Sequence, residues 1–69
     1  MATVTQKFGQ RVKELRKKKG LSQEKLAELA KIDYSYLNAI EAGKKNPSIK
    51  RVAKIARVLG VSLPELFSF

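Results

Sequence analysis

The sequence predicts an all-α fold of five short helices packed around one small core. Nothing in the 69 residues alternates apolar and polar side chains with a period of two, so no strand is expected. Apolar residues recur at helical spacing, and serines and glycines stand where helices would begin and end. The connections are only a few residues long, which forces consecutive helices to pack against one another. We therefore expect residues 1–69 to form a single domain.

The first expected helix runs from Thr5 to Lys19 and ends at Gly20. Apolar residues fall at positions i, i+4 and i+7 of one face, namely Phe8, Val12 and Leu15. The other faces carry lysine and arginine. This helix should therefore turn one narrow side to the core and a basic surface to solvent.

Three further helices are predicted from the residues that cap them. Each has a capping residue with one apolar residue directly before it and another four positions after it, the arrangement of a hydrophobic staple, and these caps are Ser22, Asp33 and Ser62. Ser62 also forms a capping box with Glu65. The remaining helix opens at Pro47 and Ser48 and closes at Gly60. Its expected inward stripe is Ile49, Val52, Ala53, Ala56 and Leu59.

Composition limits the function. The chain carries 15 Lys and Arg against 6 Asp and Glu, a net charge of +9 that favours a polyanion, with nucleic acid ahead of an anionic membrane. The alternative is that this charge serves solubility alone. There is no histidine or cysteine, and no glycine-rich phosphate loop, so we expect no enzyme, metal site or cofactor. With neither a long apolar run nor a secretory signal, the protein should be soluble and cytoplasmic.

The second and third helices are predicted to form a helix-turn-helix. Only Lys31, Ile32 and the Asp33 cap separate them, so they must cross steeply. At 100° per residue, Leu37 and Ile40 of the third helix point inward. The outward residues are Ser35, Asn38, Ala39 and Ala42. This thin face fits a DNA major groove, where serine and asparagine can hydrogen-bond base edges.

Residues beside this face are candidates for contacts with the DNA backbone. Gln23 begins the second helix, where free backbone N–H groups favour a phosphate. The loop after the third helix adds Lys44, Lys45 and Asn46, although the two lysines have an alternative role as solvated loop charges. Tyr34 and Tyr36 lie on either side of the outward face, where their hydroxyls would reach phosphates or bases. For Tyr36 the alternative is a half-buried packing role.

The stretch LSQEKLAELAKIDYSYLNAIEAGKKNPS resembles the helix-turn-helix of the phage Cro and repressor superfamily, also called the Xre family. The likeness extends from about Phe8 to Phe67. It is carried in order by Gln23, Leu26, Ala27, Ala30, Leu37, Ile40, Glu41, Gly43, Asn46, Pro47 and Ser48. The resemblance implies a five-helix, lambda-repressor-like transcriptional regulator whose homodimer reads palindromic double-stranded DNA with the third helix. By position, Gln23 would contact phosphate, while Tyr34, Ser35, Asn38 and Ala39 would face bases.

The resemblance also implies a structural pair between Arg16 and Glu41. The turn departs from the family pattern, which usually has glycine where this chain has Lys31. A positive φ there would cost a non-glycine residue roughly 1 kcal/mol or more. The segment DYSY is similar to small controller proteins of restriction–modification systems, which often carry Asp-Arg-Thr-Tyr. Tyr34 in place of that arginine would remove a strong guanine contact.

A homodimer is expected because one small core should not bury every apolar residue near the C-terminus. The candidates for a two-fold interface are Ile55, Val58, Leu66, Phe67 and Phe69. Such a dimer would place two recognition helices about 34 Å apart along the duplex. For Phe69 the alternative is a disordered terminal position.

Two other functions are compatible with these residues. One is an antitoxin that binds a partner toxin as well as its own promoter. The other is a less specific nucleic-acid-binding protein, for instance one that binds RNA, because the first helix is strongly basic. A membrane-surface role would need a free apolar helix face, whereas that of the first helix is needed in the core. The chain has no room for an effector-binding domain, so no small-molecule effector is expected.

Overall fold

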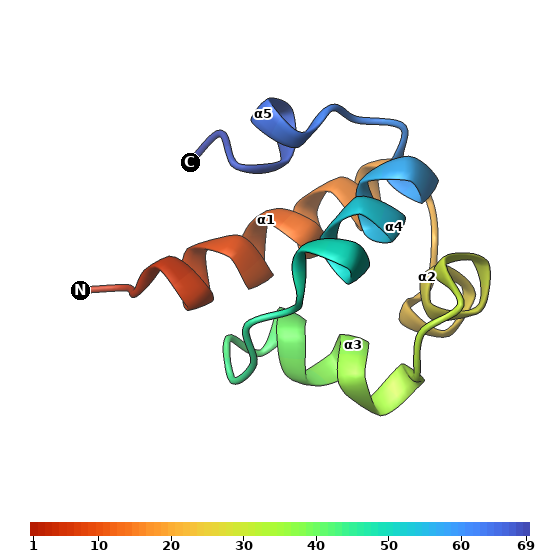
Figure 1. The fold of residues 1–69 in the computed structure, drawn as a ribbon, viewed down its shortest axis with the longest axis horizontal. Helices are drawn as coiled ribbons and strands as arrows, with labels where there is room; N and C mark the ends of the chain where they lie inside the picture. The colour runs from red at the N-terminus through yellow and green to blue at the C-terminus, as the bar shows by residue number, and fades with distance from the viewer.

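A computed structural model describes all 69 residues and contains five helices and no strand, as the sequence predicts. The helices are α1 (Val4–Lys18), α2 (Gln23–Ala30), α3 (Tyr34–Glu41), α4 (Ile49–Leu59) and α5 (Leu63–Leu66). Figure 1 shows α1 and α4 in the middle of the molecule, with α3 along one edge and α5 along the opposite edge. None of the helices has both the length and the apolar character needed to cross a bilayer.

Side-chain caps fix the start of four helices. The hydroxyl groups of Ser22, Ser48 and Ser62 each accept a hydrogen bond from a backbone N–H in the first turn of the helix that follows. Thr3 forms a capping box ahead of α1, which therefore begins at Val4 and not at the predicted Thr5. Asp33 precedes α3 as expected, but its side chain makes no capping hydrogen bond.

The capping box of α5 forms as predicted. The hydroxyl of Ser62 accepts a hydrogen bond from the backbone N–H of Glu65, and the Glu65 carboxylate accepts one from the backbone N–H of Ser62. The pKa of Glu65 lies below its usual value. The larger cause is the hydrogen bond that its carboxylate accepts from the Ser62 backbone N–H, and the smaller is the one that it accepts from the Ser62 hydroxyl. Arg11 of α1 donates to the Glu65 carbonyl oxygen at 2.8 Å, which joins α5 to α1.

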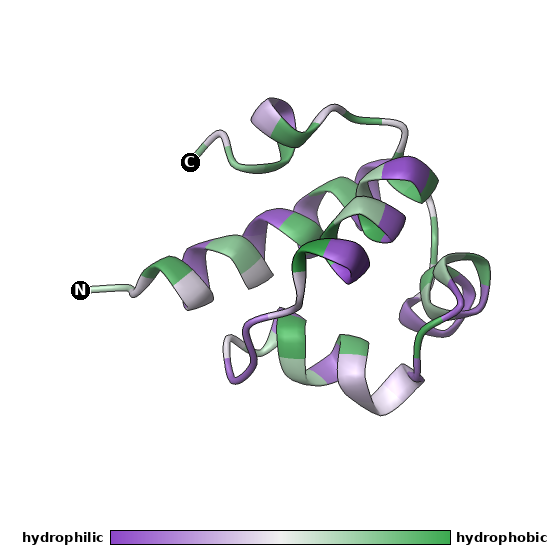
Figure 2. Cartoon of the chain, viewed as in Figure 1, coloured by the Kyte–Doolittle hydropathy of each residue, from purple (hydrophilic) through white to green (hydrophobic).

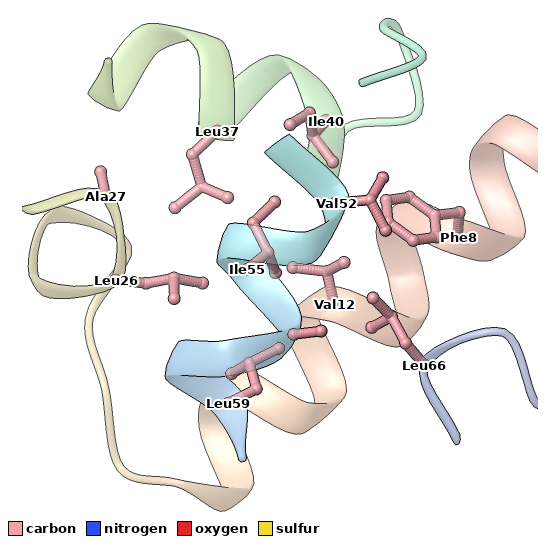
Figure 3. Packing of buried hydrophobic residues seen from close by; sticks show 11 residues of the cluster. Phe8, Val12, Leu26, Ala27, Leu37, Ile40, Val52, Ile55, Leu59 and Leu66 are labelled. Carbon is pink, nitrogen blue, oxygen red and sulfur yellow. The ribbon is translucent and has the colours of Figure 1, made fainter. Parts of the chain in front are cut away.

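The core draws apolar side chains from all five helices. Figure 3 shows Leu37 and Ile40 of α3 pointing towards α4, which runs through the middle of the cluster. The largest fully buried side chains are Leu26, Leu37, Ile40, Ile55, Leu66 and Val12. The two inward residues of α3 are therefore fixed by packing, and this fixes which side of α3 faces away.

The inward stripe of α4 differs from the predicted one. The buried residues are Val52, Ile55, Ala56 and Leu59, which still follow the helical pattern i, i+3, i+4 and i+7. Ala53 is exposed and Ile49 is 84% exposed. The prediction started the stripe at Ile49, the first residue of the helix, where no other element covers the side chain. The prediction was correct for Val52, Ala56 and Leu59 but excluded Ile55.

Two of the residues predicted for a dimer interface are corrected by this packing. Ile55 is fully enclosed by the protomer's own core, and so is Leu66, which α5 inserts between α1 and α4. Neither side chain can reach a second copy without unfolding part of the first. The prediction of these two interface residues is therefore wrong.

The crossing of α1 over α3 is a contact between backbones. Gly9 of α1 is buried, and a Cβ added to it would lie 3.0 Å from the Glu41 carbonyl oxygen and still closer to that of Ile40. These two carbonyl groups belong to the last turn of α3, where no flexible side chain can move aside. The end of α3 therefore rests directly on the backbone of α1.

The turn between α2 and α3 is left-handed at Lys31, whose φ and ψ are 56° and 48°. Lys31 is the one non-glycine residue with positive φ. The backbone N–H of Ile32 donates to the Ala27 carbonyl oxygen at 3.0 Å, and its side chain packs against the core. The chain therefore accepts the backbone strain that a glycine would avoid.

Replacing Lys31 with glycine should raise the free energy of unfolding by about 0.5–1 kcal/mol, because glycine adopts this conformation without a steric penalty. Lys31→Ala keeps the Cβ and removes the same charge, so it is the matched control and should not gain this stability. Urea unfolding measures both. Equal midpoints for the two variants would show that the turn is not strained.

Candidate nucleic-acid interface

The outward face of α3 is open to solvent. Ser35, Asn38 and Ala42 are exposed and Ala39 is partly exposed. No other element covers this side of α3 in Figure 1. In Figure 2 α3 begins pale and ends green, with only one purple band between, so strongly hydrophilic residues are few on this helix. The residues predicted to point outward form one narrow, weakly polar strip.

The two tyrosines flank this strip in different ways. Tyr34, at the start of α3, is exposed. Tyr36 is partly buried and packs against the core, which agrees with the packing role given above as the alternative for this residue. The Arg51 guanidinium lies 4.7 Å from the centre of its ring and the Lys45 ammonium 5.6 Å, both within the range of cation–π attraction. The Tyr36 ring therefore keeps two cations beside α3.

The loop after α3 is fixed at both of its ends. Gly43 has a φ of 74°, which lets the chain reverse after the helix. Further on, Asn46 accepts a hydrogen bond from the Thr5 hydroxyl of α1. Lys44, Lys45 and Asn46 are all exposed, on the same stretch that follows the outward strip.

Arg16 and Glu41 form the pair that the resemblance implies. The Arg16 Nε donates to Glu41 Oε2 at 2.8 Å and its Nη2 donates to Oε1 at 3.1 Å. The two side chains are only 9% and 3% exposed. Arg16 Nη1 also donates to the Leu21 carbonyl oxygen at 2.7 Å, so α1, the connection before α2 and the end of α3 are joined at one point.

Gln23 is engaged with other protein side chains. Its Nε2 donates to Glu41 Oε1 at 2.9 Å, and its Oε1 accepts from Asn38 Nδ2 at 3.1 Å. Beside them is a hollow of about 150 Å³, lined also by Lys13 and Ala42. A contact between Gln23 and a phosphate remains a prediction, and one N–H of its amide is left to make it.

Sequence reasoning missed a set of basic residues on α4. A shallow cleft of about 510 Å³ between the turn and the start of α4 is lined by Lys31, Lys50, Arg51 and Lys54, with Asp33 as its one carboxylate. The residues of α4 reach the turn because α4 packs against α2. Their signal in the sequence was three cations within five residues, but only the folded chain shows which surface they join.

No group of three His, Cys, Asp or Glu side chains is close enough to hold a metal ion. The fold presents a pair of short helices, α2 and α3, joined by a tight turn, with one thin face of α3 uncovered and the cations Lys45 and Arg51 beside it. These features define a helix-turn-helix protein.

The sequence profile of a helix-turn-helix family matches residues 12–66, which is most of the chain. The chain belongs to this family, and its resemblance to the Xre type is confirmed. Among known proteins it is 46% identical over 63 residues to the control protein C.MunI of a Mycoplasma species, which covers 90% of this chain and 85% of that protein.

Solved structures have the same fold. The restriction–modification controller protein C.AhdI from Aeromonas hydrophila superposes with a TM-score of 0.87 at 47% identity, over 90% of this chain and 94% of that one. SinR, a master regulator for biofilm formation solved in complex with DNA, superposes with a TM-score of 0.82 at 47% identity, over 86% and 95% of the two chains.

Proposed function

We propose that this protein is a transcriptional regulator that binds a specific double-stranded DNA sequence as a homodimer, in the manner of a restriction–modification controller. The observation that carries the proposal is the uncovered strip of Ser35, Asn38 and Ala42, held outward because Leu37 and Ile40 are buried behind it. The strip fits a major groove, and base edges there carry a distinct pattern of donors and acceptors for each base pair.

The contacts divide by chemistry. Ser35, Asn38 and Ala39 face the bases, with Tyr34 at the rim of the groove. On one side of the strip, Gln23 contacts a backbone phosphate. On the other side, phosphates contact residues that follow α3 and a cation that stacks on Tyr36. The cations of this second set are Lys44, Lys45 and Arg51, and the neutral amide of Asn46 lies on the same stretch as the two lysines. The net charge of +9 and the DNA-bound relative support this division.

The homodimer rests on apolar side chains that the core leaves uncovered. Phe67 and Phe69 are each about half exposed, with ring centres 6.3 Å apart, and Leu63 is exposed in the same C-terminal segment. Val58 is partly buried beside the core. An isologous pairing of this surface in two copies relates the recognition helices by a two-fold axis, so the operator is palindromic.

The rest of the assignment follows from the same site. We propose that residues 1–69 act as one cytoplasmic domain that needs no cofactor or small-molecule effector and catalyses no reaction. A second role as an antitoxin would require a protein partner. The controller and regulator names among its relatives support DNA as the primary ligand.

Selection of bound duplexes from a random pool tests the function directly. The wild type should enrich one sequence with two-fold symmetry. Ser35→Ala should relax base preference. Lys45→Ala should weaken all sequences alike and reduce the slope of log affinity against log salt by about 2, which is about 1 for each protomer of the homodimer. Lys19→Ala is the matched control, because Lys19 lies beside Gly60 at the far end of α4.

Two results would contradict the proposal. A wild-type pool without any enriched sequence would remove specific DNA recognition. An enriched sequence without symmetry would retain recognition but remove the homodimer.

A further inference from the structure

Four side chains form an unbroken line of hydrogen bonds from the core to the outward strip of α3. Arg16 donates twice to Glu41, Gln23 donates to Glu41, and Asn38 donates to Gln23. Arg16 and Glu41 are nearly buried, whereas Asn38 is exposed on the outward strip of α3. The line contains every hydrogen bond that Gln23 makes through its side chain.

The direction of each bond in this line is fixed by its charged end. A guanidinium only donates and an ionised carboxylate only accepts, so the Gln23 amide must turn its NH₂ group towards Glu41. Its oxygen then faces Asn38 and can only accept, which requires Asn38 to turn its own NH₂ group inward. Rotating either amide by 180° would set two acceptors or two donors against each other.

The consequence is that Asn38 shows the DNA one particular side. Its Oδ1 is left free to accept, together with the second N–H of the same amide. An acceptor beside a donor matches the N6 amine and N7 of adenine. It does not match guanine, which offers O6 and N7, both acceptors, at the same place in the groove.

We propose that Gln23 is a positioning residue for base recognition, which holds the Asn38 amide so that it selects adenine at the base it faces. This inference rests on the proposed function, since it requires Asn38 to lie in a major groove. It assigns to Gln23 a part in specificity, in addition to the phosphate contact expected from its place at the start of α2. The two roles make different predictions, because a phosphate contact supports all sequences equally.

The test measures the DNA affinity of four proteins: wild type, Gln23→Met, Asn38→Ala and the double variant. Each protein is measured on four duplexes, which are the selected operator and three copies that carry each of the other bases at one position. That position is the one at which Asn38→Ala loses discrimination. Methionine keeps the length and helix propensity of glutamine but removes both its donor and its acceptor. Wild type should prefer adenine there by roughly 5- to 150-fold, which corresponds to the 1–3 kcal/mol of one good bidentate pair.

Gln23→Met should reduce this preference at least about 3-fold while leaving the preference at other positions unchanged, because the freed amide can rotate and accept alternative bases. In the Asn38→Ala background the same substitution should change the preference no further, since Gln23 acts through Asn38. Circular dichroism of each variant confirms that it is folded before binding is measured.

If Gln23→Met does not fold, hydrogen exchange of side-chain NH₂ groups in the wild type tests the inference instead. The Asn38 side-chain NH₂ signals should exchange with water more slowly than those of Asn46, whose NH₂ group makes no hydrogen bond within the chain. Equal exchange rates would overturn the inference. So would a Gln23→Met protein that binds all four duplexes more weakly by one common factor, although specific DNA binding would then stand. If the wild type discriminates between no duplexes at all, both proposals fail.

Discussion

Replacing Arg16 with methionine is expected to lower the free energy of unfolding by about 3–5 kcal/mol. The substitution leaves the Glu41 carboxylate, whose side chain is 3% exposed, without its cation. It also removes the donor to the Leu21 carbonyl oxygen. Glu41→Met should cost a similar amount, because it leaves the Arg16 guanidinium buried and unpaired. Urea unfolding followed by circular dichroism measures both losses.

The double variant Arg16→Met, Glu41→Met should lose much less than the sum of the two, because no uncompensated charge remains and two apolar side chains fill the space. The exposed pair of Lys25 and Glu28, 3.3 Å apart on α2, is the control. Breaking it with Lys25→Met should cost no more than about 1 kcal/mol. Additive losses at Arg16 and Glu41 would show that the two groups are not energetically coupled.

Gly9→Ala is expected to lower the free energy of unfolding by about 3 kcal/mol, near the upper end for overpacking a core. The new methyl group would overlap the carbonyl oxygens at the end of α3, so α1 and α3 must separate. This cost exceeds the gain of about 1 kcal/mol that alanine normally brings to a helix interior. Thermal unfolding detects the difference.

Gln10→Ala, at the next position of α1 and exposed, controls for helix propensity and should stay within about 0.5 kcal/mol of wild type. A Gly9→Ala protein as stable as wild type would mean that the two helices do not touch at this point.

Much of the fold could be predicted because its signals are local. Ser22, Ser48 and Ser62 cap helices within a single turn, and the 100° spacing of Leu37 and Ile40 fixed the outward side of α3. These features depend on neighbours three or four residues away. The caps and the outward side of α3 can therefore be predicted from the amino-acid sequence alone.

The features that could not be predicted depend on distant parts of the chain. Whether Ile49 is buried depends on what covers the first turn of α4, and in the folded chain nothing does. The bond between Gln23 and Asn38 joins residues 15 positions apart, and Arg51 reaches Tyr36 only after α4 has packed. The need for glycine at position 9 could not be predicted either, because it comes from the carbonyl groups at the end of α3, which lie close to Gly9 only in the folded chain.

The end of α3 rests on the α1 backbone at Gly9, on the side of α3 opposite its outward strip. The position of the helix and the identity of the residues that it exposes are therefore set by different parts of the chain. Because the Gly9 backbone and the buried pair of Arg16 and Glu41 set the position of α3 at this end, residues on its outer strip can change without moving the helix. A lineage with this scaffold can therefore acquire a new operator through substitutions at a few solvent-facing positions, while the underlying frame is inherited intact.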